Sequence, residues 1–216
     1  MKIPKKIHLV WIGGERPTTF DYFFEEIKKI NNEYEIIEWT EHNIDFELKN
    51  RELFDNTTNL GAKSDILRFE ILHKYGGIYM DYDFLQIKNF DGLLDYDFFA
   101  GTNEKAPQQV WNSIVGSKPN NPICEKFLDG LKTVNPIGRH EIDRVMNETG
   151  PNYLTDLIFK NSWDCNYKVF IGPEFFPFPL EDRYMIRNFT KEDIEHIRSF
   201  KTEETYCIHF HTTSWL

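Results

Sequence analysis

The segment GAKSDILRFEILHKYGGIYMDYDF, residues 61–84, decides the fold because it carries the signals of a helix, a turn and a buried strand in succession. Its apolar residues recur on one helical face, Ser64 is a good N-cap, and Gly76 and Gly77 can adopt the positive φ that ends a helix. The run IYM that follows predicts a short strand ending at Asp81. Ligands of open α/β sheets bind at such strand ends, so we expect a functional site at Asp81.

The N-terminal part of the chain predicts a strand, a helix and a second strand. KIHLVWI, residues 6–12, is a nearly continuous apolar run closed by two glycines, as in a buried parallel strand. Residues 19–30 predict an amphipathic helix capped by Thr18 or Thr19, and YEIIEW, residues 34–39, predicts a second strand. This β-α-β opening indicates an α/β fold with a mostly parallel mixed central sheet flanked by helices.

The rest of the chain alternates less regularly. Residues 93–101 and 109–117 have strand-like patterns, helices are expected around 122–131 and 151–160, and the apolar run ETYCIHFH lies near the C-terminus. No Pro/Gly/Ser-rich linker of useful length interrupts the chain. We therefore expect one domain, residues 1–216.

Composition excludes several function classes. The formal net charge is −10, which disfavours a nucleic-acid partner or an anionic membrane surface because either would repel the chain. No apolar run approaches the roughly 18 residues of a membrane span, and the N-terminal run is shorter than the signal-peptide core of about seven to fifteen residues. The three cysteines are widely spaced and form no CxxC pair. These features predict a cytoplasmic protein in a reducing compartment.

The tetrapeptide DYDF occurs twice, at residues 81–84 and 95–98. In an extended segment, side chains two residues apart leave on the same face, so Asp81 and Asp83 can converge while Tyr82 turns into the protein. The first copy follows a predicted helix and an apolar strand, whereas the second has no such neighbours. We interpret the first copy as functional and the second as a turn entering the next strand, with both of its aspartates solvated.

Two carboxylates are too few ligands for Mg²⁺ or Mn²⁺, which also take phosphate oxygens, water and a further protein group. The C-terminal run IHFHTTSW places His209 and His211 on one face of a strand, followed by the hydroxyl of Ser214. Asp65 and Arg68 lie one turn apart on the helix before the first DYDF. They form either an ion pair on a surface helix or the polar floor of a pocket below the strand end.

Four blocks spread over nearly the whole chain carry a family resemblance: IPKKIHLVWIGG, AKSDILRFEILHKYGGIYMDYDF, TGPNYLT at residues 149–155, and IHFHTTSW. In this order the blocks resemble the DxD-containing sugar transferases of glycosyltransferase family 32, which include initiating mannosyltransferases and capsular polysaccharide enzymes. The chain is also similar to the glucosyltransferase domain of the large clostridial cytotoxins. The middle block, S-D-x-x-R followed by G-G-I-Y-x-D-x-D, carries most of the specificity.

The resemblance implies a GT-A fold, a Rossmann-like α/β domain that uses a nucleotide-diphosphate sugar. It implies that Trp11 stacks on the uracil of UDP and that Asp65 and Arg68 hold the donor sugar and its diphosphate. Tyr79 matches a tyrosine hydrogen-bonded near the phosphates. Asp81 matches the carboxylate that contacts ribose and sugar hydroxyls.

The resemblance also implies Mn²⁺ or Mg²⁺ as cofactor, with Asp83 as a direct ligand. His209 aligns with the histidine of the family's I-H…S-W ending, but a second histidine, His211, departs from that pattern, so both are candidate ligands. Ser214 matches a hydroxyl that reaches the metal in the toxins. Trp215 would cover the diphosphate.

The implied activity is retaining transfer of a sugar from a UDP-sugar to a glycan, glycoprotein or other hydroxyl acceptor. A GDP-sugar is the second donor, because mannosyl relatives use GDP. Asn112 falls where relatives often have an asparagine near the donor sugar. Two alternatives are a Mg²⁺-dependent phosphotransferase or phosphatase of the haloacid dehalogenase type, and a non-catalytic, metal-dependent sugar-binding module. The chain is either a complete small enzyme or the N-terminal module of a longer one.

Overall fold

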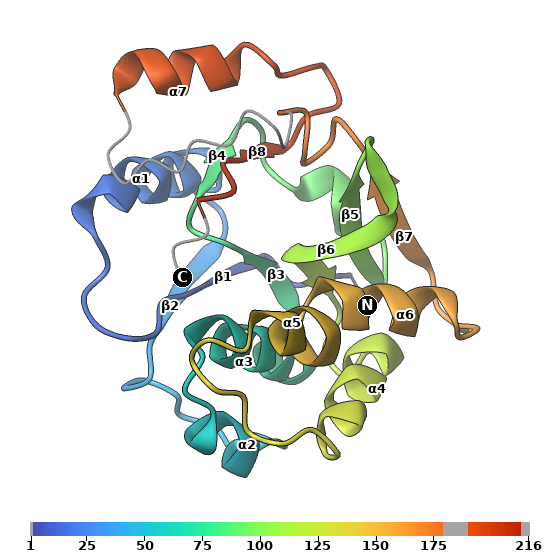
Figure 1. Ribbon diagram of the computed structural model, residues 1–216. Coiled ribbons are helices and arrows are strands. Elements are labelled where there is room, and N and C mark those ends of the chain that lie inside the picture. Colours follow the sequence, from blue (N-terminus) through green and yellow to red (C-terminus); the bar gives the residue numbers. More distant parts are fainter. Residues whose placement is uncertain (1, 179–189, 213–216) are drawn as a thin grey trace.

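A six-stranded mixed sheet forms the centre of the computed structural model, which describes residues 2–178 and 190–212 (Figure 1). The strand order is β2-β1-β3-β6-β5-β7, and β6 is the strand that pairs antiparallel with both of its neighbours. The predicted α/β fold with a mostly parallel central sheet is therefore confirmed. The strands are β1 (Lys6–Val10), β2 (Glu35–Trp39), β3 (Gly77–Met80), β5 (Phe98–Asn103), β6 (Ala106–Ser117) and β7 (Tyr167–Ile171).

Helices cover both faces of the sheet (Figure 1). One face carries α3 (Leu60–Tyr75), α4 (Pro122–Leu131) and α6 (Pro151–Phe159), with the short α2 (Arg51–Asn56) and α5 (Ile142–Arg144) outside them. The other face carries α1 (Asp21–Ile30), α7 (Lys191–Arg198) and a two-stranded sheet of β4 (Phe84–Gln86) and β8 (Cys207–His209). Short 3₁₀ turns span Thr18–Phe20 and Asp91–Leu93, and a π-helical turn spans Val145–Thr149.

Each face of the sheet buries its own hydrophobic cluster. On β3, Ile78 and Met80 belong to the cluster under α1, β4 and β8, whereas Tyr79 belongs to the cluster under α3 and α4. This alternation follows from the two-residue period of a strand. Asp81 follows Tyr79 by two residues, so its side chain leaves the strand end on the same face as Tyr79.

The start of α3 differs from its prediction. Asn59 is the N-cap, and its side chain accepts a hydrogen bond from the amide of Ala62 at 3.0 Å. The prediction that Ser64 is the N-cap was wrong. Ser64 lies inside the helix, where its hydroxyl accepts a hydrogen bond from Arg68 at 3.0 Å. The predicted end is confirmed, because Gly76 follows the last helical residue with φ 63°.

The predicted cap of the first helix was also wrong. Thr18 and Thr19 lie in a 3₁₀ turn that runs directly into α1, and neither end of that junction has a side-chain capping bond. Proline at position 17 opens the turn instead. Its fixed φ is compatible with the first residues of a helix.

The second DYDF forms a turn that enters β5 at Phe98, as predicted. Asp95 is exposed and pairs with Lys2 at 2.9 Å. Asp97 is more than a solvated turn residue, which corrects the prediction: it forms a salt bridge with Lys118 and accepts from the amide of Asn166 at 2.8 Å. Asp97 therefore connects the beginning of β5 with the residue after β6 and the residue before β7.

Within residues 2–178 and 190–212, the structure contains no helix that is both long and apolar enough to cross a membrane.

Candidate functional site

A cavity of about 440 Å³ opens at the carboxyl ends of β1 and β3. It is bordered by α3, β6, the α5 region and the segment after β8. Ser214 and Trp215, two of the predicted site residues, lie outside the described residues. The other predicted site residues all line this cavity: Trp11, Asp65, Arg68, Tyr79, Asp81, Asp83, His209 and His211.

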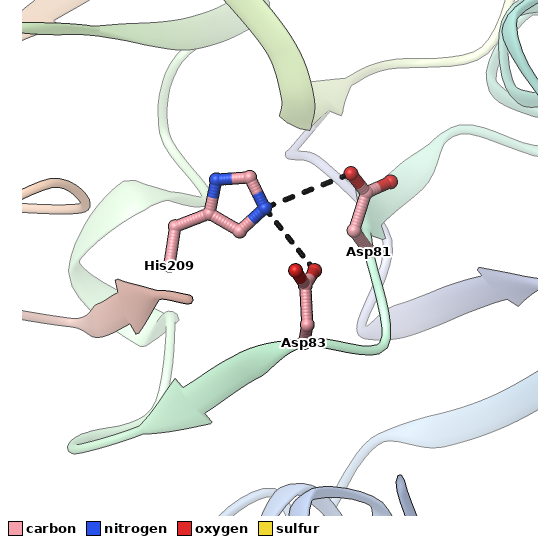
Figure 2. Close-up of side chains that lie close together, drawn as sticks. All are labelled: Asp81, Asp83 and His209. Carbon is pink, nitrogen blue, oxygen red and sulfur yellow. Dashed lines mark hydrogen bonds and ion pairs between the residues drawn. The ribbon is translucent and has the colours of Figure 1, made fainter. Parts of the chain in front are cut away.

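Asp81, Asp83 and His209 converge in this cavity (Figure 2). Nε2 of His209 lies 3.1 Å from Oδ1 of Asp83 and 3.8 Å from Oδ2 of Asp81. The two carboxylates belong to the connection between β3 and β4, and antiparallel pairing of β4 with β8 places Phe84 opposite His209. Two short strands far apart in sequence thus bring the histidine to the DxD pair.

This group has the composition of a divalent-metal site. Each of its residues offers one ligand atom, and these atoms lie within 4.8 Å of one another. Among the described residues it is the one group of His, Cys, Asp or Glu side chains with this property. Two carboxylate oxygens and an imidazole nitrogen are a donor set that suits Mn²⁺, and Mg²⁺ accepts the oxygens.

Neighbouring groups orient the ligands. Oδ2 of Asp83 accepts hydrogen bonds from the amide and the hydroxyl of Thr212, at 2.7 and 2.9 Å, which leaves Oδ1 facing His209. The ring of His209 stacks on Phe84, with centroids 4.3 Å apart and an angle of 11°. Its Nδ1 has no hydrogen-bond partner among the described residues, so the ring is held by this stacking and by the contact of Nε2 with Asp83. No sequence feature had pointed to this role of Thr212.

His211 lies beside this group rather than in it. Its ring centroid is 4.0 Å from that of His209, and it packs near Trp111 and Phe176. Its backbone has φ 55°, an uncommon left-handed conformation for a residue with a side chain. Of the two histidines left open by the sequence, His209 is the one whose Nε2 approaches both carboxylates.

Asp65 and Arg68 form the polar floor of the cavity, not a surface ion pair. Each is 5% exposed, and Nη2 of Arg68 lies 3.2 Å from Oδ1 of Asp65 and 3.7 Å from Oδ1 of Asp81. Arg68 also donates to the carbonyls of Ser64 and Asn112, at 3.2 and 2.7 Å. The guanidinium is thereby fixed next to the carboxylates of the DxD.

Tyr79 connects the floor with the DxD pair. Its ring lies under the guanidinium of Arg68, with the central carbon 4.3 Å from the ring centroid. Its hydroxyl donates to Oδ1 of Asp81 at 2.5 Å. Tyr79 therefore orients one oxygen of Asp81, while the other oxygen faces His209.

Two further residues hold Asp65, and the sequence did not single out their contact with it. Nδ2 of Asn112 donates to Oδ1 of Asp65 at 2.8 Å, and the hydroxyl of Thr149 lies 3.1 Å from Oδ2. Thr149 is the first residue of the TGPNYLT block, so the sequence motif included this residue but did not indicate its contact with Asp65. Both carboxylate oxygens of Asp65 are thus engaged.

Electrostatics differ among the three carboxylates. Burial raises the pKa of Asp65 to about 7, although Arg68 beside it acts in the opposite direction. Burial also raises the pKa of Asp81 above its ordinary value. Burial alone would raise the pKa of Asp83 too, but the imidazole of His209 and the donors of Thr212 bring it below the ordinary value. Asp83 is therefore ionised at neutral pH, the state in which a carboxylate can bind a metal ion.

Trp11 also lines the cavity, just after β1. Its ring packs against Phe20 and Tyr82, with centroid distances of 5.4 and 5.9 Å. Tyr82 points into the protein, as predicted, and its hydroxyl donates to Glu38 at 2.6 Å. Residue 82 therefore supports the aromatic end of the cavity, while its two neighbours supply the carboxylates.

Comparison with known proteins relates the chain to glycosyltransferases. Residues 17–100 match the family described as "Glycosyltransferase sugar-binding region containing DXD motif". An uncharacterized glycosyltransferase of Acanthamoeba polyphaga mimivirus is 30% identical over 166 residues, covering 72% of this chain and 64% of the relative. A mannosyl phosphorylinositol ceramide synthase of Saccharomyces cerevisiae is 28% identical over 159 residues, covering 71% of this chain and 41% of the relative. The chain thus spans less than two thirds of the length of these relatives.

A solved structure shares the fold. The PaToxG glycosyltransferase superposes with a TM-score of 0.61 at 22% identity, covering 74% of this chain and 70% of that chain. The chain is therefore related to DXD-containing glycosyltransferases and has their α/β fold, which confirms the resemblance stated from the sequence.

Proposed function

We propose that this chain is a metal-dependent glycosyltransferase that moves a sugar from a nucleotide-diphosphate donor to a hydroxyl acceptor. One observation carries the proposal: the Asp81, Asp83 and His209 group shares a cavity with the buried Arg68 and Asp65. Such a cavity combines ligands for a cation, a fixed positive charge and a carboxylate that accepts from hydroxyl groups. A sugar diphosphate presents the complementary groups.

The residues around the DxD would act on the diphosphate. Asp83 and His209, with Asp81, would hold Mn²⁺ or Mg²⁺, and the imidazole nitrogen would favour Mn²⁺. When bound, the cation neutralises negative charge that develops on the leaving diphosphate. Arg68 stabilises the same charge with a guanidinium that is already oriented in the protein. The resemblance further assigns a hydroxyl that reaches the metal to Ser214 and a cover over the diphosphate to Trp215, both outside the described residues.

The remaining residues would recognise the donor. Trp11 stacks on the base, Tyr79 fixes Asp81 near the phosphates and ribose, and Asp65 accepts from sugar hydroxyls. A UDP-sugar is favoured because a single aromatic platform suits uracil, and a GDP-sugar is the second donor class. We further propose retention of anomeric configuration, a glycan or glycoprotein acceptor, and residues 1–216 as one catalytic domain.

The two alternative functions fit the structure less well. A phosphatase of the haloacid dehalogenase type needs its acidic pair after the first strand, whereas this pair follows β3. A calcium-dependent sugar-binding module is usually all-β, whereas helices cover both faces of this sheet. Neither alternative requires the fixed guanidinium of Arg68.

A donor screen tests the proposal. Hydrolysis of UDP-sugars and GDP-sugars is measured with Mn²⁺ for the wild type and for Asp83→Asn, with Asp95→Asn as the control from the second DYDF. We expect slow hydrolysis of at least one donor, reduced about 100-fold or more in Asp83→Asn and unchanged in Asp95→Asn. Hydrolysis of no donor by the wild type, or equal rates in wild type and Asp83→Asn, would contradict the proposal.

A further inference from the structure

The π-helical turn Val145–Thr149 lies against the polar floor of the cavity. Its defining bond runs from the amide of Gly150 to the carbonyl of Val145 at 2.8 Å. The widened turn places the hydroxyl of Thr149 3.1 Å from Oδ2 of Asp65. Single π-helical turns are rare and occur often at functional sites, so this one calls for a physical explanation.

Gly150 allows the turn to approach Asp65. A Cβ at this position would lie 2.7 Å from the carbonyl oxygen of Val145 and 3.4 Å from Oδ2 of Asp65. A contact of 2.7 Å with backbone forces a shift, so any side chain here would displace the turn. Pro151 then begins α6, which packs on β6. The close approach of Thr149 to Asp65 is therefore built into the backbone.

Two hydrogen-bond donors and one ion-pair partner, from three parts of the fold, meet the carboxylate of Asp65. Thr149 donates to Oδ2 from the π-helical turn and Asn112 on β6 donates to Oδ1 at 2.8 Å, while Arg68 on α3 forms an ion pair with Oδ1 at 3.2 Å. A carboxylate accepts about four hydrogen bonds in total. Two of these are used by Asn112 and Thr149, and Asp65 lines the cavity, so about two acceptor positions remain for a ligand.

Thr149 itself cannot contact a ligand, because its exposed fraction is 0%. Its effect must pass through Asp65. A carboxylate held from both sides cannot rotate to follow a hydroxyl that is in the wrong place. It therefore discriminates between sugars that differ in the position of one hydroxyl group, in the way that a site built around one hydrogen bond rejects an analogue lacking it.

We propose that Thr149 is a positioning residue that fixes Asp65 so that a free acceptor position on its carboxylate reads one hydroxyl group of the donor sugar. The inference rests on the proposed function and specifies it further. The π-helical turn then acts on selection between sugar epimers and not on binding of the nucleotide. The nucleotide would be bound by Trp11 and by the Asp81, Asp83 and His209 group. Among the described residues, no hydrogen bond joins any of these side chains to the π-helical turn.

The test compares Thr149→Val, which removes the hydroxyl at nearly constant volume, with Thr149→Ser, which retains it. Hydrolysis of UDP-glucose and of its epimer UDP-galactose is measured with Mn²⁺, and UDP affinity is measured by calorimetry. We expect Thr149→Val to lower kcat/KM for the better of the two sugars about 10-fold and to reduce the ratio between them. UDP affinity stays within about 2-fold, and Thr149→Ser restores the ratio.

Thr155→Val is the matched control. The hydroxyl of Thr155 accepts from the amide of Val110 at 2.8 Å and donates to the carbonyl of Pro151, so its loss weakens the attachment of α6 without affecting Asp65. We expect Thr155→Val to lower the Tm and leave the sugar ratio unchanged. If Thr149→Val does not fold, Thr149→Ala removes the same hydroxyl without placing a methyl group beside Asp65.

The possible failures can be separated. A wild type that neither binds nor hydrolyses any nucleotide sugar overturns the proposed function and this inference with it. An active wild type whose sugar ratio is unchanged in Thr149→Val overturns this inference alone. The same holds if Thr149→Val weakens UDP binding as much as it lowers kcat/KM, because the residue would then support the whole site.

Discussion

Arg68 donates hydrogen bonds from all three of its guanidinium nitrogens to other parts of the protein. Two acceptors belong to Ser64 on the same helix, and one is the carbonyl of Asn112 on β6. A cation held in this way does not need to reorganise when negative charge develops beside it. The residue therefore gives the proposed site a positive charge whose position is set by folding, before any ligand arrives.

His8 is a buried histidine whose neighbours require the neutral ring. Its Nε2 donates to the carbonyl of Gly76 at 2.8 Å, and its Nδ1 accepts from the indole of Trp39 at 3.0 Å. Protonation would turn Nδ1 into a donor that faces another donor. Burial accordingly lowers the pKa of His8 to about 4.

This pKa predicts acid sensitivity. The unfolded chain binds a proton at His8 near the ordinary pKa of about 6.5, whereas the folded protein does so near 4, so stability is lost as the pH falls between these values. From pH 7 to pH 5 we expect the free energy of unfolding to fall by about 2 kcal/mol more in the wild type than in His8→Gln. Urea unfolding at both pH values measures this difference, with the exposed His42→Gln as control. Equal pH dependence in wild type and His8→Gln would contradict it.

At the scale of elements, α3 determines where the site lies, because it carries Asp65 and Arg68 and leads directly into β3. Its N-cap, Asn59, makes two contacts: it accepts from the amide of Ala62 and donates to the carbonyl of Arg139 at 2.9 Å. The cap thus fixes the helix start and ties it to the loop before α5.

Loss of this cap should weaken the protein measurably. Asn59→Ala removes both contacts, and we expect a decrease of about 1 to 2 kcal/mol in the free energy of unfolding. Asn59→Ser keeps a capping oxygen but cannot reach as far, so it should recover about half of the loss. Chemical denaturation of the three proteins measures the series. If Asn59→Ala were as stable as the wild type, the start of α3 would lie elsewhere.

Elements with strong local patterns were predictable from the sequence. A nearly continuous apolar run indicated β1, the helical period indicated α3, and the glycines at 76 and 77 indicated where α3 ends; β2, α4 and α6 also lie where strands and helices were expected. The N-cap of α3 could not be predicted, because Asn59 and Ser64 are both good capping residues and lie only five positions apart. The 3₁₀ turn at the start of α1 and the π-helical turn at Thr149 have no clear sequence period.

At the scale of the whole molecule, the site depends on contacts between distant segments. The resemblance led to both partners, Asp83 and His209, but which of the two C-terminal histidines faces the carboxylates depends on the register of β4 with β8. Those strands have three residues each, too few to predict a register from periodicity. Likewise, Thr149 and Asp65 are 84 residues apart, and their contact follows only from packing of the π-helical turn on α3.

The whole-molecule arrangement predicts that nucleotide binding requires the metal. The cation would be held jointly by the segment after β3 and by β8, so the diphosphate binds fully only when both segments and the metal are in place. Asp95→Ala, in the second DYDF, serves as the matched control because its side chain is exposed and lies outside the cavity.

Calorimetric titration of UDP with and without Mn²⁺, on the wild type, Asp83→Ala and Asp95→Ala, is the most direct test. We expect UDP to bind the wild type and Asp95→Ala at least about 10-fold more tightly with Mn²⁺, and this gain to be absent in Asp83→Ala. UDP binding that is unaffected by Mn²⁺ or by Asp83→Ala would contradict the proposed site.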